Sequence, residues 1–188
     1  ENKNIALTTI IPYKILEDGE MLNSFQYAYN IANKLAPQAK VTVPTTFVDV
    51  TITVITYYAA YQCKDWAWVY RHAGIEAYWS SSNSTVSVSN MLVRYDTKGD
   101  LYEYPTVVEK GVSNSTCLQR DYFKRSSINK SNPTKGTIYI DGNNTMPYNR
   151  VVYCSNFFEH GGLIYLKLNY RANGTSYVHD RSYYVYTK

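Results

Sequence analysis

The stretch FVDVTITVITYY, residues 47–58, decides the fold because its aliphatic and polar side chains alternate. A β-strand places successive side chains on opposite faces of its sheet, so this segment predicts a strand with one buried and one polar face. Burial of four aliphatic side chains contributes several kcal/mol, at about 25 cal/mol per Å². The run is longer than a usual strand of about five or six residues, which predicts a bulge or bend near Tyr57 and Tyr58. The buried set is Val48, Val50, Ile52 and Val54.

The same period of two continues along the chain after Pro37. Turn sequences separate the runs, and the NG of ANGT at 172–175 is the strongest hairpin signal among them. Many short strands predict a mainly β protein, an antiparallel β-sandwich of the Ig-like or jelly-roll type. The predicted strands are 40–43, 47–61, 66–70, 75–79, 85–95, 101–108, 137–141, 150–156, 163–170, 176–179 and 182–187.

The N-terminal part has a different pattern. The run NIALTTII, at 4–11, predicts a first strand, either within its own sheet or donated to a neighbouring molecule. Apolar residues then recur every three or four positions between 21 and 35, which predicts one amphipathic helix over about 20–36 that Pro37 ends. Without a linker or an internal repeat, residues 1–188 are expected to form a single domain with this helix on or beside the sheet.

Composition limits the class of protein. The chain is 45% hydrophobic and 18% charged, which suits a folded domain with a sizeable core. It contains no apolar run of about 18 residues, so no membrane-spanning helix is expected. The net charge of +4 is too small to indicate nucleic acid as a partner. The chain begins at Glu1 without an apolar leader, which fits a mature secreted, extracellular protein and equally a shortened chain.

Cysteines and glycosylation sequons bear on the compartment. Three cysteines give an odd count with no metal-ligand spacing, so one disulfide and one lone thiol are expected outside the cell. The favoured bridge joins Cys117 to Cys154, with a stabilisation of about 3–4 kcal/mol, and leaves Cys63 as a buried thiol. A pairing of Cys63 with either partner stays open. The sequons weakly favour a secreted glycoprotein, and lie at Asn83, Asn114, Asn129, Asn143 and Asn173.

Aromatic residues form the densest feature of the sequence. The chain has 21 tyrosines, and the segment CKDWAWVYRHAGIEAYW spans residues 63–79. If Trp66, Trp68 and Tyr70 lie on one strand they share a face, and Trp79 lies on the next predicted strand. Such a row either fills a core or, if exposed, forms a platform on which sugar rings or a protein partner stack.

A basic segment forms the second candidate surface. QRDYFKRSSINKSNPTKG, at 119–136, carries a local charge of +4 and is rich in Ser, Asn and Pro, which predicts an exposed loop. A loop of this charge suits an anionic surface, a polysaccharide or lipid headgroups, and also suits plain solvation. The candidate ligand-binding residues here are Arg120, Lys124 and Arg125.

Catalytic motifs are missing from the sequence. Glu159 and His160 are adjacent, and neighbours on a strand point to opposite faces, so they do not form an acid–base pair by themselves. Glu76 and Asp96 form a carboxylate dyad only if their strands meet. The spacing of His72, His160 and His179 indicates no metal site, and no nucleotide or cofactor motif occurs.

Three hypotheses follow for the function. The favoured one is a non-catalytic, secreted or cell-surface binding or adhesion protein that recognises a glycan or a protein partner, with self-association as a variant. The second is a β-pore-forming or membrane-active toxin, suggested by the Ser/Thr-rich segment at 79–91 that resembles an inserting hairpin. The third is a secreted hydrolase of polysaccharide or cell wall that uses the carboxylates above.

Overall fold

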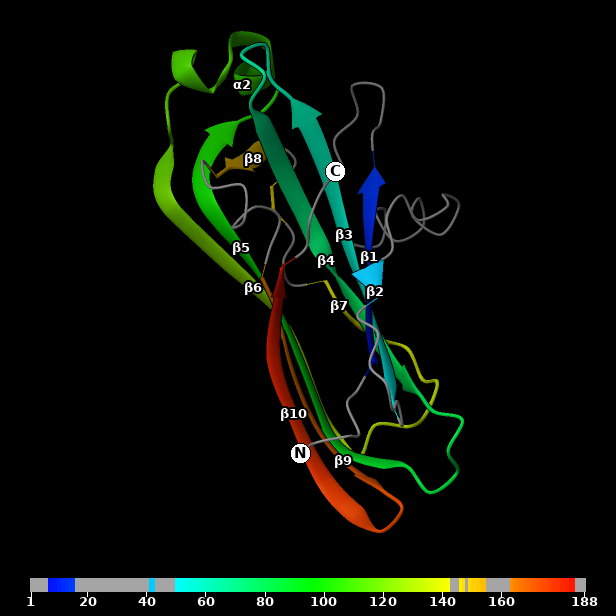
Figure 1. Cartoon of the computed structure of the whole chain (residues 1–188). Helices are drawn as coiled ribbons and strands as arrows, with labels where there is room; N and C mark the ends of the chain where they lie inside the picture. Colours follow the sequence, from blue (N-terminus) through cyan, green and yellow to red (C-terminus); the bar gives the residue numbers. More distant parts are fainter. Residues whose placement is uncertain are drawn as a thin grey trace.

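The computed structural model describes residues 7–15, 41–42, 50–142, 146–147, 149–154 and 163–184. Within these ranges ten strands form one hydrogen-bonded sheet (Figure 1). A short helix α2 (Thr106–Lys110) and a 3₁₀ turn η1 (Val112–Asn114) follow β5. The strands are β1 (Leu7–Ile15), β2 (Val41–Thr42), β3 (Thr51–Gln62), β4 (Trp68–Ser80), β5 (Ser87–Glu103), β6 (Gln119–Ser131), β7 (Tyr139–Asp141), β8 (Arg150–Tyr153), β9 (Leu163–Ala172) and β10 (Thr175–Tyr184).

The order of the strands is β10-β9-β5-β8-β4-β3-β1-β2, with β6 paired to β5 and β7 paired to β4. All of these pairs are antiparallel except β1 with β3. The mainly β, antiparallel character predicted from the sequence is therefore confirmed. The sheet does not close into a barrel. The sandwich type stays a prediction, and the predicted helix at 20–36 lies outside the described residues.

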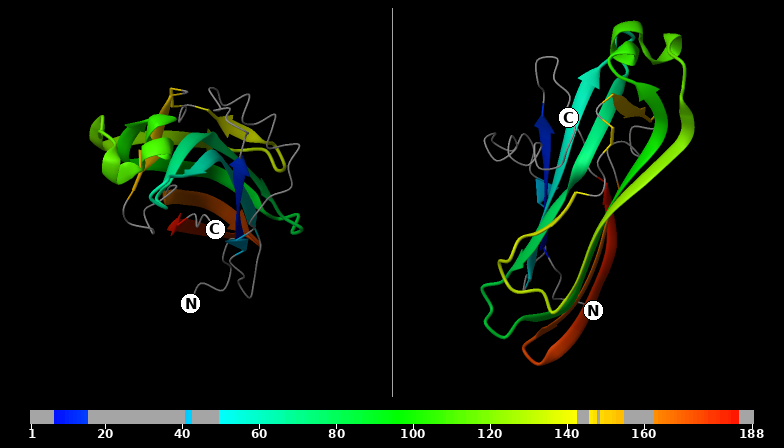
Figure 2. Two further views of the ribbon diagram at one scale, coloured as in Figure 1. Left: turned by 90° about the horizontal axis from the view of Figure 1, so that it is seen from above. Right: turned by 180° about the vertical axis from the view of Figure 1, so that it is seen from behind.

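The sheet bends so strongly that its two halves face each other, with β3 and β4 on one side and β9 and β10 on the other (Figures 1 and 2). Buried side chains of β3, β4, β5, β6 and β9 fill the space between them. Ile52, Val54 and Ile75 are fully buried on one half, and Ile164 and Leu166 on the other. This main core holds the elongated molecule together through the hydrophobic effect.

The alternation of residues 47–58 predicts the burial of β3 correctly where the structure describes it. Val50, Ile52 and Val54 are fully buried in the main core. The sequence predicts that the opposite, polar face meets solvent, but Thr53 on that face is also buried. The register of β3 against β4 shifts between Tyr57 and Tyr58, so the predicted bulge is confirmed.

A second hydrophobic cluster lies at the end of the sheet that carries α2. Tyr61, Val69, Tyr102 and Val151 bring β3, β4, β5 and β8 together, and Val107 of α2 packs against them fully buried. This cluster fixes α2 onto the sheet. It therefore anchors the connection between β3 and β4 as well, because that connection packs beside α2.

The segment at 79–91 is not the hairpin that the second hypothesis requires. It comprises the end of β4, a connection and the start of β5. In the described sheet these two strand ends do not pair with each other: β4 pairs there with β3 and β7, and β5 with β6 and β9. The Ser and Thr residues are explained by an exposed connection, in which the carboxamide Oδ1 of Asn83 accepts hydrogen bonds from the N–H and hydroxyl of Thr85. Among the described residues, no helix is long and apolar enough to cross a membrane.

Two predicted turns have different outcomes. The hairpin at 172–175 is confirmed: β9 and β10 are joined by Asn173 and Gly174, which both have positive φ, as a type I′ turn requires. The predicted turn at 97–100 is wrong, because β5 runs through it. Gly99 instead lies at an irregularity, where its φ of +150° and the carbonyl of Tyr153, 2.4 Å from an added Cβ, leave no room for a side chain.

Candidate binding site

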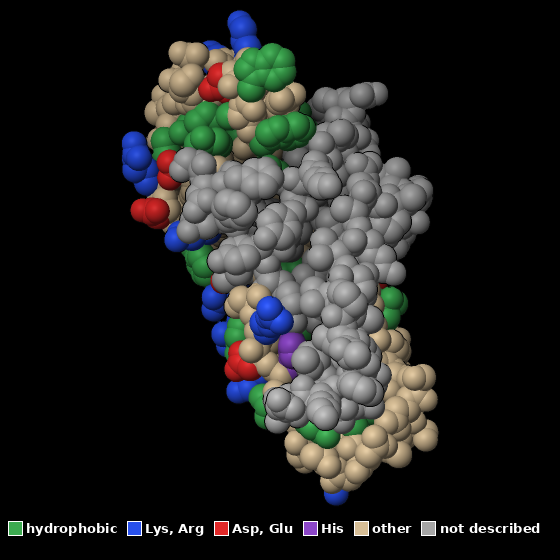
Figure 3. Space-filling model, in the orientation of Figure 1, with side chains coloured by type: hydrophobic (Ala, Val, Ile, Leu, Met, Phe, Trp, Pro, Cys, Tyr) green, Lys and Arg blue, Asp and Glu red, His purple; other side chains and the backbone are tan. Residues whose placement is uncertain are grey.

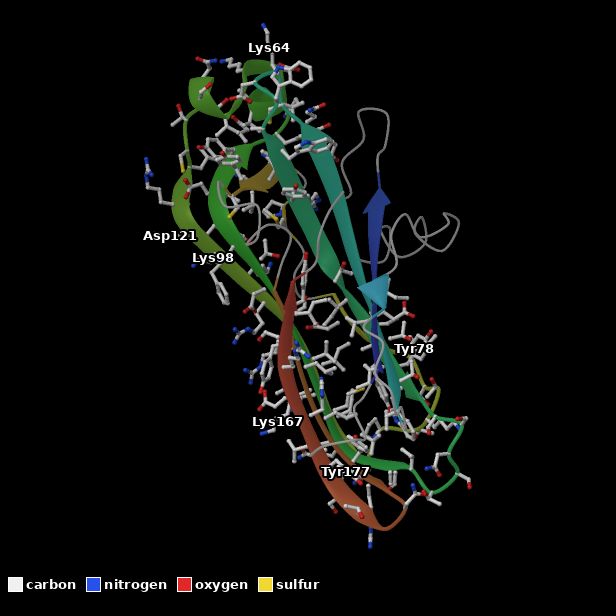
Figure 4. All side chains as sticks on the ribbon, in the orientation of Figure 1. Lys64, Tyr78, Lys98, Asp121, Lys167 and Tyr177 are labelled. Carbon is white, nitrogen blue, oxygen red and sulfur yellow. The ribbon has the colours of Figure 1, made fainter. Side chains whose placement is uncertain are left out.

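The loop between β3 and β4 forms the most exposed aromatic feature of the described structure. Residues 63–67 make a tight turn in which the N–H of Cys63 donates to the carbonyl of Ala67 over 2.7 Å. The N–H of Trp66 donates to the carbonyl of Cys63 over 2.9 Å. These two bonds fix the backbone of the loop. Lys64, at its tip, lies at the end of the molecule that carries α2 (Figure 4).

The α2–η1 segment holds this loop in place. The N–H of Lys64 donates to the carbonyl of Val108 over 3.0 Å. The Oδ2 atom of Asp65 accepts hydrogen bonds from the N–H and the hydroxyl of Ser113, over 3.0 and 3.1 Å. These bonds stabilise the carboxylate and lower the pKa of Asp65 below its ordinary value. We call this arrangement, formed by Asp65, Ser113 and the adjoining Gly111, the Asp65 latch.

Trp66 projects from this fixed loop into solvent. Its side chain is 79% exposed, and its backbone has a φ of +67°. A left-handed conformation costs a residue with a Cβ about 1–2 kcal/mol. The tight turn at 63–67 requires this backbone conformation, but a large apolar side chain in solvent gains nothing from folding, so its exposure is not explained by the stability of the isolated chain. Such a combination points to contact with a ligand.

The other aromatic residues predicted for the platform separate into exposed and buried groups. Trp68, the first residue of β4, is 36% exposed. Tyr70 and Trp79 are buried, and the indole N–H of Trp79 donates to the carbonyl of Pro133 over 2.8 Å. Trp66 does not share a strand with Trp68, because it lies in the turn before β4. The described aromatic surface is therefore the pair Trp66 and Trp68, which we call the tryptophan tip.

A small polar cavity lies at the same end of the molecule. It has a volume of about 130 Å³, and its lining includes Lys110 of α2 and Asn114 of η1. The same α2–η1 segment holds the β3–β4 loop through Val108 and Ser113, so the cavity and the tryptophan tip belong to one rigid end. The cavity offers carboxylate, hydroxyl, amide and ammonium groups, from Glu103, Thr106, Lys110, Asn114, Ser115 and Thr116.

The basic segment is a strand rather than the predicted loop. Arg120, Lys124 and Arg125 all belong to β6. The guanidinium of Arg125 donates to both carboxylate oxygens of Asp96 on β5, over 2.6 and 2.8 Å, and lies over the ring of Phe123. Part of its charge is therefore already compensated. Basic side chains follow the edge of the molecule that β6 forms (Figure 3).

None of the three cysteines forms a disulfide in the structure, so the predicted bridge between Cys117 and Cys154 is not formed. Cys63 is buried in the second hydrophobic cluster, as predicted for a lone thiol. Burial and, to a smaller extent, the charge of Asp65 raise the pKa of Cys63 to about 11. The thiol is therefore protonated at neutral pH and is a packing group, not a nucleophile.

The two carboxylates of the predicted dyad lie on strands, β4 and β5, that do not pair with each other in the described sheet. Asp96 is engaged by Arg125, and Glu76 is a buried residue of β4. Glu159 and His160 lie outside the described residues, and the side chain of His72 is not described. No group of three or more residues suited to hold a metal ion occurs in the part of the chain that the structure describes.

Comparison with protein-family models, with curated proteins and with solved structures gives no significant match. The sequence identified Trp66 and Trp68 by their residue type, but it did not identify Asp65, Gly111 or Ser113. A hydrogen bond between residues 48 positions apart leaves no periodic signal in a single sequence.

Proposed function

We propose that this chain is a non-catalytic binding protein that recognises a glycan or a protein partner through the tryptophan tip. The observation that carries the proposal is Trp66, 79% exposed on a loop fixed by backbone bonds and by the Asp65 latch. A rigid, exposed indole loses little conformational entropy on binding. Tryptophan is also among the residues that contribute most to binding energy at interfaces.

The neighbouring polar cavity favours a glycan over a plain apolar ligand. A sugar ring has one apolar face, which suits an indole, and a rim of hydroxyl groups that need hydrogen-bond partners. Carboxylate, amide and ammonium groups of Glu103, Asn114 and Lys110 supply such partners at the same end of the molecule. A protein partner would use the same indole as an anchor, with the polar groups at the rim of the interface.

We also propose that the protein is secreted and that its fold is of the sandwich type. The described sequons support secretion, because Asn114, Asn129 and Asn173 are exposed and therefore accessible to glycosylation. The facing halves of the bent sheet and the core between them support a sandwich-like description. The segment at 79–91 does not form a hairpin in the described structure, so it does not support the toxin hypothesis. Within the described residues no arrangement of side chains favours the hydrolase.

The proposal is tested by a screen of glycan arrays and cell-surface proteins with wild type, Trp66→Ala and Trp68→Ala. We expect Trp66→Ala to weaken binding at least tenfold and Trp68→Ala to weaken it less, because Trp68 is less exposed. Val178→Ala is the matched control, since it removes a 62% exposed apolar side chain from β10. Tyr177, its neighbour, lies at the end opposite Lys64 (Figure 4).

The fluorescence of the protein reports the same event independently. Ligand at the tip should shift the emission of the wild type and shift that of Trp66→Phe less, because Trp68 is then the one tryptophan left at the tip and Trp79 is buried. Unaltered affinity in Trp66→Ala would contradict the proposed site. A wild type that binds no glycan and no surface protein would contradict the proposed function itself.

A further inference from the structure

Arg71 lies in β4 and carries a long, charged side chain. It is almost completely buried, with 1% of its surface exposed. Its Nη1 atom donates to the carbonyl of Pro147, which also accepts from the N–H of Arg150. The Nε and Nη2 atoms are buried, and no acceptor in the described part of the chain contacts them. The guanidinium therefore has one hydrogen-bonded edge and one buried edge without a hydrogen-bond partner.

The edge without a partner destabilises the folded state electrostatically. Removal of an unpaired cation from water costs several kcal/mol even after relaxation. Burial lowers the pKa of Arg71 to about 10, so the side chain still carries its proton at pH 7. The ionisable groups that act on its pKa are the phenols of Tyr61 and Tyr122, and burial raises the pKa of Tyr122 above its ordinary value. Its charge is therefore balanced by none of the described carboxylates.

The two free atoms have a specific geometry. In a planar guanidinium the N–H of Nε and one N–H of Nη2 point the same way along one edge, with a spacing that matches two oxygens of one oxyanion. Arginine binds carboxylate and phosphate groups through this edge in two parallel hydrogen bonds. A spherical ion such as chloride meets the edge with a single atom and does not reproduce that match.

We propose that the unpartnered edge of Arg71, formed by Nε and Nη2, binds a small oxyanion, a carboxylate or a phosphate-type group, inside the fold. The site lies on β4 and next to Pro147, so it is separate from the tryptophan tip, and it does not depend on the proposed function. The anion supplies the two acceptors and the negative charge that Arg71 lacks.

The test uses the full chain, refolded from urea into chloride buffer so that any copurified anion is lost. Acetate, phosphate and sulfate are added separately at millimolar concentrations, with chloride adjusted to constant ionic strength. At these concentrations general salt exclusion has little effect on stability. We expect a saturable rise in Tm, of about 5–10 °C at one hundred times Kd. A response to acetate alone identifies a carboxylate, and a response to phosphate and sulfate identifies a tetrahedral anion.

Two variants assign the response to Arg71. Arg71→Lys keeps the charge but lacks the two-pronged edge, and it should lose most of the rise in Tm. Arg181→Lys, at an exposed position on β10, should retain it. If Arg71→Lys does not fold, the Nε–H resonance of Arg71 in wild-type NMR spectra provides the readout, since a bound oxyanion shifts it. A wild type whose Tm and Nε–H resonance respond to all three oxyanions no more than to chloride would overturn the proposal, as would a full response in Arg71→Lys.

Discussion

Gly111 determines how closely the β3–β4 loop approaches α2 and η1. Its φ is +91°, and a Cβ at this position would lie 2.6 Å from Cγ of Asp65. Glycine is therefore required twice, once by the backbone conformation and once by the side chain that packs against it. The approach brings Asp65 within reach of the N–H of Ser113, on which the rigidity of the tryptophan tip depends.

Substitution of Gly111 by alanine separates these two requirements. Gly136 is the matched control, because its φ is +73° and an added Cβ there meets nothing within 4 Å. We expect Gly136→Ala to lower the free energy of unfolding by about 1–2 kcal/mol through backbone strain alone. Gly111→Ala should lower it by about 1–3 kcal/mol more, because Asp65 must move. Urea denaturation measures both, and equal losses would show that the latch tolerates a methyl group.

The Asp65 latch also predicts how stability depends on pH. The bonds from Ser113 lower the pKa of Asp65 in the folded state. They therefore stabilise the fold above the unfolded pKa of about 3.9, and this stabilisation is lost as the pH falls through the lower folded pKa. We expect wild type to exceed Asp65→Asn in Tm at pH 6, with a gap that narrows towards pH 2. Asp121→Asn, at an exposed site on β6, is the control and should not reproduce this narrowing.

At the scale of the strands, β6 shows where sequence patterns are insufficient. Ser126 and Ile128 are buried on its inner side, while Phe123 and Arg125 are exposed on the other. The alternation is real, but its inner positions include serine and lysine, so the segment resembles a polar loop in composition. β6 pairs with only one neighbour in the described sheet, β5, and such a strand needs few apolar residues.

The ion pair between β5 and β6 is expected to contribute little to stability. Arg125 and Asp96 form two short hydrogen bonds, but their side chains are 42% and 19% exposed. A double-mutant cycle with Asp96→Ala and Arg125→Ala should give a coupling of about 0.5–1 kcal/mol, which weakens in 1 M NaCl. A cycle of Asp96→Ala with Lys130→Ala, farther along β6, should give nearly none. A salt-independent coupling above about 2 kcal/mol would contradict this view of the pair.

Across the whole molecule, local patterns predicted the elements better than their arrangement. The runs at 163–170 and 137–141 correspond closely to β9 and β7, because alternation and turn residues act over a few positions. The position of β8 between β4 and β5 depends on pairing between distant residues, which no local pattern encodes. For the same reason, residue type alone indicates Trp66 and Trp68. It indicates neither the Asp65 latch that holds their loop nor the burial of Arg71.

The position of β8 has a consequence for how a cell makes this protein. A ribosome releases β5 about 50 residues before it completes β8, which takes about 3–10 s at ordinary rates of synthesis. During that interval β4 and β5 both exist, but the strand that joins them has not been made. The facing edges of the nascent chain are then unpaired and open to strands of other molecules. We therefore expect the nascent chain to depend on chaperones through this interval and until β9, which pairs with β5, has also been made.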